Sequence, residues 1–258
     1  MSTTWPGRTG MSRPSPVRRV AQLYAGLVLF GVSVALLVAA RLGLDPWDVF
    51  HQGLARRAGL PIGWVVIAVS VVVLLAWIPL RQRPGIGTVS NVIVVGLVVD
   101  AVLPVLPQPR ALAVRAAFLA AGILTNGIAT GLYIGAGLGP GPRDGLMTGL
   151  AVRGWPIRRV RTLIEAAVLA VGWLLGGTVG IGTLLYAAGI GPLAHVFIPR
   201  FAIDVPEGDH DDKRAVRAQR AGLRRTRRGP GRTGPAGGGT RLRLRLHRRP
   251  PVRGRAHV

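Results

Sequence analysis

Cysteine is absent from this chain of 258 residues. Its absence excludes disulfide bonds, thiolate catalysis and cysteine-based metal sites. The histidines do not follow the spacing of a metal-binding motif, and they are His51, His195, His210, His247 and His257. No nucleophile, base and acid fall into a catalytic pattern either. We therefore predict neither a cofactor nor an enzyme.

Acidic residues are also scarce, with 10 Asp and Glu against 33 Lys and Arg. Residues 1–200 hold 17 Arg and 5 acids (net +12), and residues 201–258 hold 16 Lys and Arg and 5 acids (net +11). The whole-chain pI near 12 is typical of a nucleic-acid binder when taken alone. The body, however, is apolar, with a mean hydropathy of +0.41 for the chain. This division into an apolar body and a strongly basic tail predicts a membrane protein with a basic tail. Nucleic acid is not an expected partner.

Long apolar runs are abundant, and each approaches the roughly 20 residues that cross a bilayer core. They cover 20–40, 62–80, 86–106, 116–136, 160–178 and 181–199. The first is longer than the apolar part of a signal peptide. Placing the N-terminus inside puts twelve arginines in inner segments and five in outer ones, as the positive-inside rule requires. We predict an all-α, six-helix protein of the cell (cytoplasmic) membrane, surrounded by lipid bilayer, with both termini cytoplasmic.

One motif occurs twice. Leu-Gly-Leu-Asp-Pro-Trp-Asp at 42–48 returns 96 positions later as Leu-Gly-Pro-Gly-Pro-Arg-Asp at 138–144, and Gly-Ile-Gly-Thr at 85–88 returns 95 positions later at 180–183. Two membrane repeats, 20–106 and 107–200, therefore resemble copies of one unit. Three crossings per copy place the second copy upside down, which predicts two inverted three-helix repeats, an architecture of many secondary transporters.

The segments that carry the motif, 43–61 and 137–157, are too apolar for plain solvent loops. They predict short helices at 50–60 and 145–153. Short Gly/Pro-interrupted segments at matching places in two halves indicate a transport site. Two interpretations stay open, namely re-entrant segments that line a site and amphipathic helices that lie at the two membrane interfaces.

Acidic side chains near or within the runs are the candidate site residues. Asp48 and Asp144 occupy the same place in the two copies, where each is expected either to N-cap the following helix or to contact a transported cation or proton. Glu165 lies about one turn into the fifth run, and Arg161 is four residues earlier on the same helical face. This glutamate is expected either to pair with Arg161 or to carry protons.

Two further polar positions match under the 95-residue offset. Asp100 and His195 lie in the last third of their runs, either as a proton relay across two gates or as groups that reach the interfaces. Asn126, an amide in the middle of a run, is expected to hydrogen-bond to another helix. The candidate transport or gating residues are thus Asp48, Asp144, Glu165, Asp100, His195 and Asn126.

Both ends of the chain differ in composition from the body. Residues 1–19 are basic and 201–258 are Arg-rich, and neither contains a run that builds a core, so both are predicted to be disordered. The tail is expected to contact anionic lipid, or else to be an extension past the natural end of the protein.

Three stretches resemble the YczE/YitT-like integral membrane proteins of bacteria, and the actinobacterial YczE-type members in particular. They are DPWDVFHQGL (45–54), IPLRQRPGIGTVSNVIVVGLVVD (78–100) and RTLIEAAVLAVGWLLGGTVGIGTLLYAAGIGPLAH (161–195). The resemblance spans about 18–200 and implies a multi-spanning protein of the cytoplasmic membrane, without supplying a substrate. Family members generally end soon after the position matched by Pro199, so the tail departs from the pattern.

The leading hypothesis is a small inverted-repeat transporter of an unknown small molecule, with proton coupling left open. The alternative is a non-transporting accessory or scaffold protein for a membrane-associated enzyme complex. A passive channel or lipid scramblase is a third hypothesis. Whether several copies assemble is left open.

Overall fold

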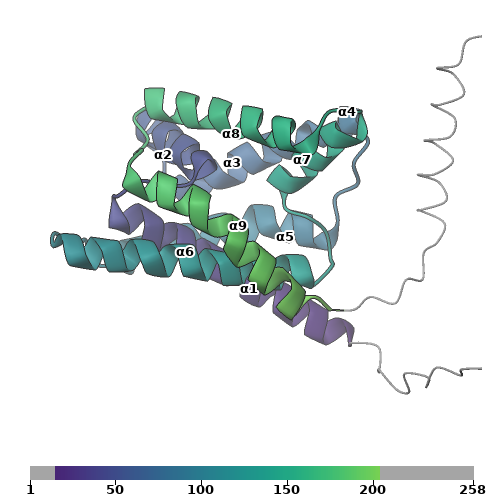
Figure 1. Ribbon diagram of the computed structural model, residues 1–258, viewed down its shortest axis with the longest axis horizontal. Coiled ribbons are helices and arrows are strands. Elements are labelled where there is room, and N and C mark those ends of the chain that lie inside the picture. The colour runs from purple at the N-terminus through teal and green to yellow at the C-terminus, as the bar shows by residue number, and fades with distance from the viewer. Residues whose placement is uncertain (1–14, 204–258) are drawn as a thin grey trace, which may run out of the picture. The chain divides into compact units, whose positions relative to one another are not determined.

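A computed structural model describes residues 15–203. The segments 1–14 and 204–258, on which most of the predicted disordered ends fall, lie outside the described residues. The described part is all-helical (Figure 1). Its elements are α1 Pro16–Ala40, α2 Pro46–Ala58, α3 Ile62–Leu75, α4 Trp77–Leu80, α5 Ile86–Val102, the 3₁₀ helix η1 Leu103–Val105, α6 Leu112–Gly135, α7 Pro142–Val152, α8 Ile157–Leu174 and α9 Ile181–Phe201.

Helix α1 begins four residues before the predicted apolar run. Ser15 is its N-cap, and the Ser15 side chain accepts a hydrogen bond from the Arg18 backbone N–H at 3.3 Å. Pro16 follows, where a missing N–H costs nothing and the fixed φ suits a helix. Residues 16–19, which include Arg18 and Arg19, are therefore helical and not part of a disordered start.

Five helical stretches are long and apolar enough to cross a membrane, namely Pro16–Ala40, Ile62–Leu80, Ile86–Val105, Leu112–Gly135 and Ile181–Phe201. They correspond to five of the six predicted spans. The remaining run, 160–178, corresponds to α8, whose 18 residues include three arginines and one glutamate. Helix α8 also ends four residues early, because Gly176 turns the chain with a φ of 95°. The sixth span stays a prediction.

The helix boundaries repeat as the motif does. The first residues of α1 and α2 are 16 and 46, and those of α6 and α7 are 112 and 142, an offset of 96. The first residues of α3 and α5 are 62 and 86, and those of α8 and α9 are 157 and 181, an offset of 95. The predicted short helices are α2 and α7, which begin earlier than expected because Pro46 and Pro142 occupy their first turns.

Helices α1 and α6 pack against each other in opposite directions. The Arg19 side chain at the start of α1 donates to the Ala136 carbonyl oxygen at the end of α6 (3.0 Å), and Arg115 at the start of α6 donates to the Ala40 carbonyl oxygen at the end of α1 (2.9 Å). Helix α5 flanks α1 and α9 flanks α6, while α2 packs on α8 and α3 on α7. In Figure 1, α8 lies along the upper edge and α1 and α6 along the lower one.

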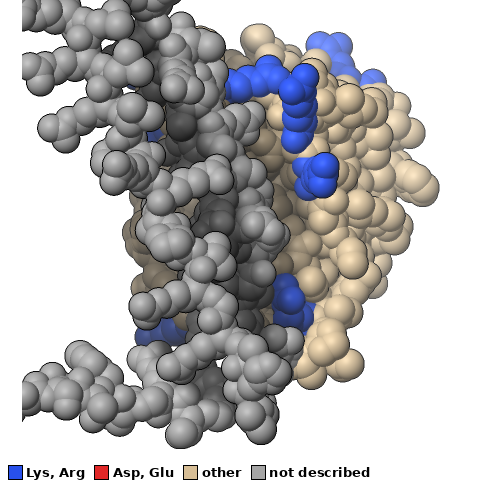
Figure 2. Space-filling view, turned by 90° about the vertical axis from the view of Figure 1, so that its right-hand side faces the viewer, with Lys and Arg blue, Asp and Glu red and all other residues tan. Residues whose placement is uncertain are grey.

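The start of α1 and the end of α9 lie at the same end of the described part, because the Gln22 amide donates to the Phe201 carbonyl oxygen at 2.8 Å. We call this end the arginine-rich end. Its exposed arginines include Arg18, Arg81, Arg83, Arg153, Arg158, Arg159 and Arg200. In Figure 2, which faces this end, arginines are scattered over the visible surface and no acidic side chain is in view.

The breaks after α1 and α6 are each held by the last helix of the other copy. The Gly182 N–H at the start of α9 donates to the Leu42 carbonyl oxygen (2.8 Å), and the Gly87 N–H at the start of α5 donates to the Leu138 carbonyl oxygen (2.9 Å). Each break turns at a glycine, with φ 118° at Gly43 and 125° at the equivalent residue 139. These values belong to the region that glycine alone enters readily.

Candidate functional site

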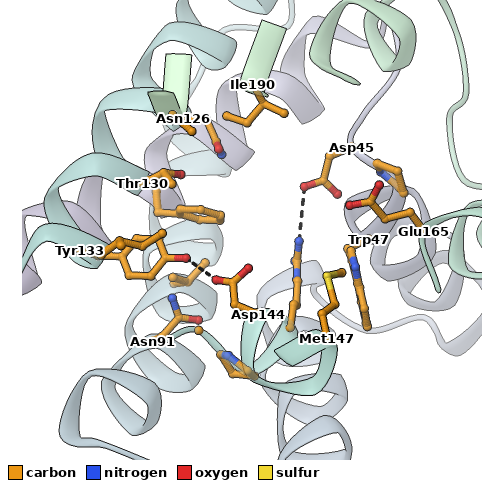
Figure 3. A pocket seen from close by; sticks show the side chains of 18 of the residues that line it. Asp45, Trp47, Asn91, Asn126, Thr130, Tyr133, Asp144, Met147, Glu165 and Ile190 are labelled. Carbon is orange, nitrogen blue, oxygen red and sulfur yellow. Dashed lines mark hydrogen bonds and ion pairs between the residues drawn. The ribbon is translucent and has the colours of Figure 1, made fainter. Parts of the chain in front are cut away.

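A cavity of about 240 Å³ lies between α2 and α7. Its wall is formed by residues of α1, α2, α3, α5, α6, α7, α8 and α9. Figure 3 shows part of this lining. Five charged side chains line it, namely Asp45, Arg143, Asp144, Arg161 and Glu165. Aromatic and polar walls come from Phe30, Trp47, Ser70, Asn91, Asn126, Thr130, Tyr133 and Tyr186. The cavity therefore combines buried charge with aromatic surface, which suits a small polar molecule.

Positions that are equivalent in the two copies face this cavity together. Under the 96- and 95-residue offsets, the pairs that line it are Phe30 and Asn126, Asp45 and Gly141, Pro46 and Pro142, Trp47 and Arg143, Val66 and Arg161, Ser70 and Glu165, Asn91 and Tyr186, and Val95 and Ile190. The cavity thus lies where the two copies meet, and at these eight positions both copies line it, with different side chains in every pair except Pro46 and Pro142.

An ion-pair cluster at this meeting point joins α2 to α7. The Arg143 guanidinium lies 3.3 Å from Asp45 and 3.3 Å from Asp48, and its central carbon lies 5.2 Å from the centre of the Trp47 ring. In Figure 3 a dashed line at Asp45 marks the first of these ion pairs. Trp47 and Arg143 are equivalent residues, so the stacking joins the two copies at a single repeated position.

The capping role in α2 belongs to Asp45. Its carboxylate accepts a hydrogen bond from the Asp48 N–H at 2.7 Å. In the second copy the N-cap is Gly141, which makes no side-chain cap, and Asp144 instead accepts a hydrogen bond from the Tyr133 hydroxyl at 2.7 Å. The prediction that Asp48 and Asp144 are N-caps is therefore wrong, because a proline in the first turn moves each cap to the residue before it.

Burial sets the protonation of the Asp45 cluster, which lies in α2 and the connection before it, outside the five apolar spans. Burial and the neighbouring Asp48 charge raise the pKa of Asp45 to about 6, although Arg143 opposes this rise. Burial also acts to raise the pKa of Asp48, but the hydrogen bond from His51 and the Arg143 charge lower it overall. Burial lowers the pKa of His51, so this imidazole is neutral at pH 7.

Three buried polar atoms of α2 have no hydrogen-bond partner within residues 15–203. They are Trp47 Nε1, Asp48 Oδ2 and His51 Nε2. The side chains of Asp48 and His51 are each 1% exposed, and they contact each other at 3.3 Å between His51 Nδ1 and Asp48 Oδ1. Unpartnered buried groups are costly and concentrate at functional sites. Arg143 alone therefore does not satisfy the hydrogen-bonding groups of this cluster.

Two other predicted contacts are present. The Asn126 amide donates to the Ser33 hydroxyl (2.8 Å) and accepts from the Tyr186 hydroxyl (3.0 Å), which links α6 to α1 and α9 as expected. Arg161 and Glu165 form the expected pair at 2.8 Å, with side chains 61% and 32% exposed. This pair therefore lies at the open margin of the cavity.

The structure does not bring Asp100 and His195 to the cavity. Asp100 accepts hydrogen bonds from the Gly63 N–H (2.7 Å) and the Trp64 N–H (3.2 Å), so it caps the start of α3. His195 is exposed on α9. Of the six predicted site residues, three line the cavity, namely Asn126, Asp144 and Glu165. Asp48 does not line it but contacts the lining residue Arg143.

Sequence reasoning missed Asp45, Trp47 and Arg143 as site residues. The available signal was their unequal chemistry inside a repeated motif, since an aspartate is matched by a glycine and a tryptophan by an arginine. Within residues 15–203, no group of three His, Cys, Asp or Glu side chains is arranged to hold a metal ion.

The apolar helices and the buried charged cavity define a polytopic α-helical membrane protein. The chain belongs to a family of unknown function (DUF6198), whose model matches residues 17–199. It is 32% identical over 180 residues to the membrane protein YczE of Bacillus subtilis, covering 69% of this chain and 84% of YczE. The resemblance to YczE-like proteins is thereby confirmed.

Two further relatives match over a similar length. A protein of Haemophilus influenzae is 40% identical over 182 residues, covering 70% of this chain and 84% of its own length. The Bacillus subtilis protein YyaS is 28% identical over 181 residues, covering 67% and 89% of the two chains. No solved structure matches the chain.

Proposed function

We propose that this protein is a small inverted-repeat transporter, not an enzyme, and that it moves a small molecule across the cell membrane by alternating access. The observation that carries this proposal is the set of eight equivalent pairs that line one central cavity. A site on the axis between two inverted copies is reached from either side by rearrangement of one copy against the other. In this account α8 is the sixth crossing and both termini are cytoplasmic.

The directions of equivalent helices support the inversion. Helix α1 and its counterpart α6 pack antiparallel. Helix α5 begins near the end of α6, at the arginine-rich end, whereas its counterpart α9 begins near the end of α1, at the opposite end. The exposed arginines at the first of these ends support its assignment as the cytoplasmic end.

Part of the cavity wall comes from helix ends at the arginine-rich end, which supports an inward-facing state. Asn91 comes from the first turns of α5, Ile134 from the last turn of α6, Arg161 from the first turns of α8, and Ile198 from the end of α9. Each of these helix ends lies at the arginine-rich end. The Arg161 side chain lines this part of the cavity and is exposed.

A second cavity, of about 390 Å³, lies at the opposite end and supports the same account. Val38 and Leu103 line it, and they are the equivalents of Ile134 and Ile198 in the central cavity. In a protein of two inverted copies, the outward-facing opening uses the positions that match those of the inward-facing one. The second cavity is the place where this opening develops.

The chain has no cysteine, so one introduced thiol reports access. Met147 lines the central cavity and is 8% exposed. We expect the Met147→Cys thiol to react with a membrane-impermeant maleimide from outside in intact cells and from inside in inverted vesicles. As controls, Arg81→Cys reacts from inside alone and Arg110→Cys from outside alone. Reaction of Met147→Cys from one side alone would contradict alternating access and favour the accessory-protein hypothesis.

A further inference from the structure

We propose that the central cavity takes a small organic cation beside Asp144, and that it exchanges this cation for a proton held by the Asp45 and Asp48 pair. The inference rests on the proposed function and names its substrate class and coupling ion.

Charges around the cavity do not balance. Arg161 pairs with Glu165, so these two charges cancel. Arg143 faces two carboxylates at 3.3 Å each and neutralises one of them. Asp144 forms no ion pair within the described residues, and its hydrogen-bond partner is the Tyr133 hydroxyl. With every carboxylate ionised, the cavity and the cluster behind Arg143 carry two negative charges in excess.

Excess buried charge is costly, and a bound cation removes the cost. The wall beside Asp144 suits an organic cation better than a hydrated metal ion. Phe30 and Tyr133 meet edge to face with ring centres 6.0 Å apart, and the thioether of Met147 completes an apolar surface. Aromatic rings attract alkylated ammonium and guanidinium groups. The Arg143 guanidinium, which stacks on the Trp47 ring, is an example in this cavity.

The second excess charge belongs to the pair that shares Arg143. Asp48 Oδ2 is buried without a partner within residues 15–203, and Asp45 is the more protonatable of the two carboxylates because burial and its acidic neighbour raise its pKa to about 6. The charged and titratable groups that face Asp45 from α2, α6, α7, α8 and α9 are Asp48, His51, Tyr133, Arg143, Asp144, Arg161, Glu165 and Tyr186.

Proton and organic cation disfavour each other because both add positive charge to one small cavity. The cation binds best when Asp45 is ionised, and its binding favours loss of the proton. This antagonism is the physical basis of cation–proton exchange. We therefore assign the coupling proton to Asp45 and Asp48. Glu165 is not assigned this role because it already pairs with Arg161, and Asp100 is not because it caps α3.

A test that needs no transport uses charged thiol reagents on purified Met147→Cys protein in nanodiscs. The probes are the trimethylammonium-ethyl and sulfonato-ethyl methanethiosulfonates, each normalised to its rate with a free thiol. We expect the cationic reagent to react about tenfold faster than the anionic one at pH 7.5. The ratio of the two rates cancels ionisation of the thiol, so it reports the charge of the cavity.

Variants locate the charge. Asp144→Asn keeps an acceptor for Tyr133 and is expected to lower the ratio about threefold or more. Asp100→Asn removes the same charge outside the cavity and leaves the ratio unchanged. Between pH 5 and 7.5 the ratio rises as Asp45 loses its proton, and Asp45→Asn abolishes this rise. Size-exclusion profiles confirm that each variant is folded.

Two outcomes would overturn the inference, namely a faster reaction of the anionic reagent and a ratio that Asp144→Asn does not change. Either result leaves access from both sides of the membrane intact, so the proposed transport stands or falls separately. Conversely, a cationic preference in a protein whose Met147→Cys thiol reacts from one side alone would retain the cation site and remove the transport.

Discussion

The two broken segments, 41–58 and 137–152, share a backbone but differ in their side chains. Both turn at a glycine of positive φ and both are held by the last helix of the other copy. At equivalent positions that line the cavity, however, Asp45 of the first copy corresponds to Gly141 of the second, and Trp47 corresponds to Arg143. The comparison teaches that the duplicated backbone builds the fold, whereas divergence at a few inward-facing positions gives the cavity its charge.

The largest expected effect comes from removing the cation that divergence places beside Asp45 and Asp48. Arg143→Met leaves Asp45 and Asp48 buried without it, which we expect to lower the free energy of unfolding by about 3–5 kcal/mol. Adding Asp45→Asn and Asp48→Asn to this variant should recover most of the loss. Chemical unfolding in detergent micelles measures both variants. A loss below about 1 kcal/mol for the single variant would show that the cluster is not a buried ion network.

Next in size is damage to the shared backbone. A Cβ added at Gly43 would lie 2.8 Å from the Gly180 nitrogen, and one added at Gly139 would lie 2.9 Å from the Thr88 hydroxyl oxygen. We expect Gly43→Ala and Gly139→Ala each to cost about 2–3 kcal/mol. Gly59→Ala is the matched control, since its φ is also positive (67°) but its Cβ would meet open space.

The same unfolding assay measures all three glycine variants. The control should lose about 1 kcal/mol, the cost of the left-handed backbone alone. Equal sensitivity of the two breaks is the result that the comparison requires. A loss at one break and none at the other would show that the two segments do not share a structural role.

The smallest effects are expected at the equivalent pair outside the cavity. Asp100→Asn has one acceptor oxygen for the two N–H groups that the carboxylate caps, so it should cost about 1 kcal/mol, whereas the exposed His195→Gln should change stability by less than about 0.5 kcal/mol. Neither substitution should alter the reagent ratio at Met147→Cys. A change in that ratio for both variants would restore the relay that the matching positions first predicted.

The sequence predicted much of the scaffold and part of the site, for identifiable reasons. Run length located five spans, and the repeated motif located the two broken segments because duplication preserves spacing. Asn126 and Glu165 were found because a polar group within an apolar run needs a partner. The Arg143 cluster was not found, since its partners lie 95 and 98 residues away in the other copy. The contact of Asp100 with the start of α3 was not predicted, because linear spacing does not reveal it.

Alternating access is tested most directly at one equivalent pair, Val38 and Ile134, with one residue in each cavity. In a Val38→Cys, Ile134→Cys variant we expect the first thiol to react from outside alone and the second from inside alone. A bulky maleimide attached at Ile134→Cys should hold the inner opening apart and slow the outside reaction at Val38→Cys. Reaction of both thiols from one side, or an outside rate that the inner label leaves unchanged, would contradict the account.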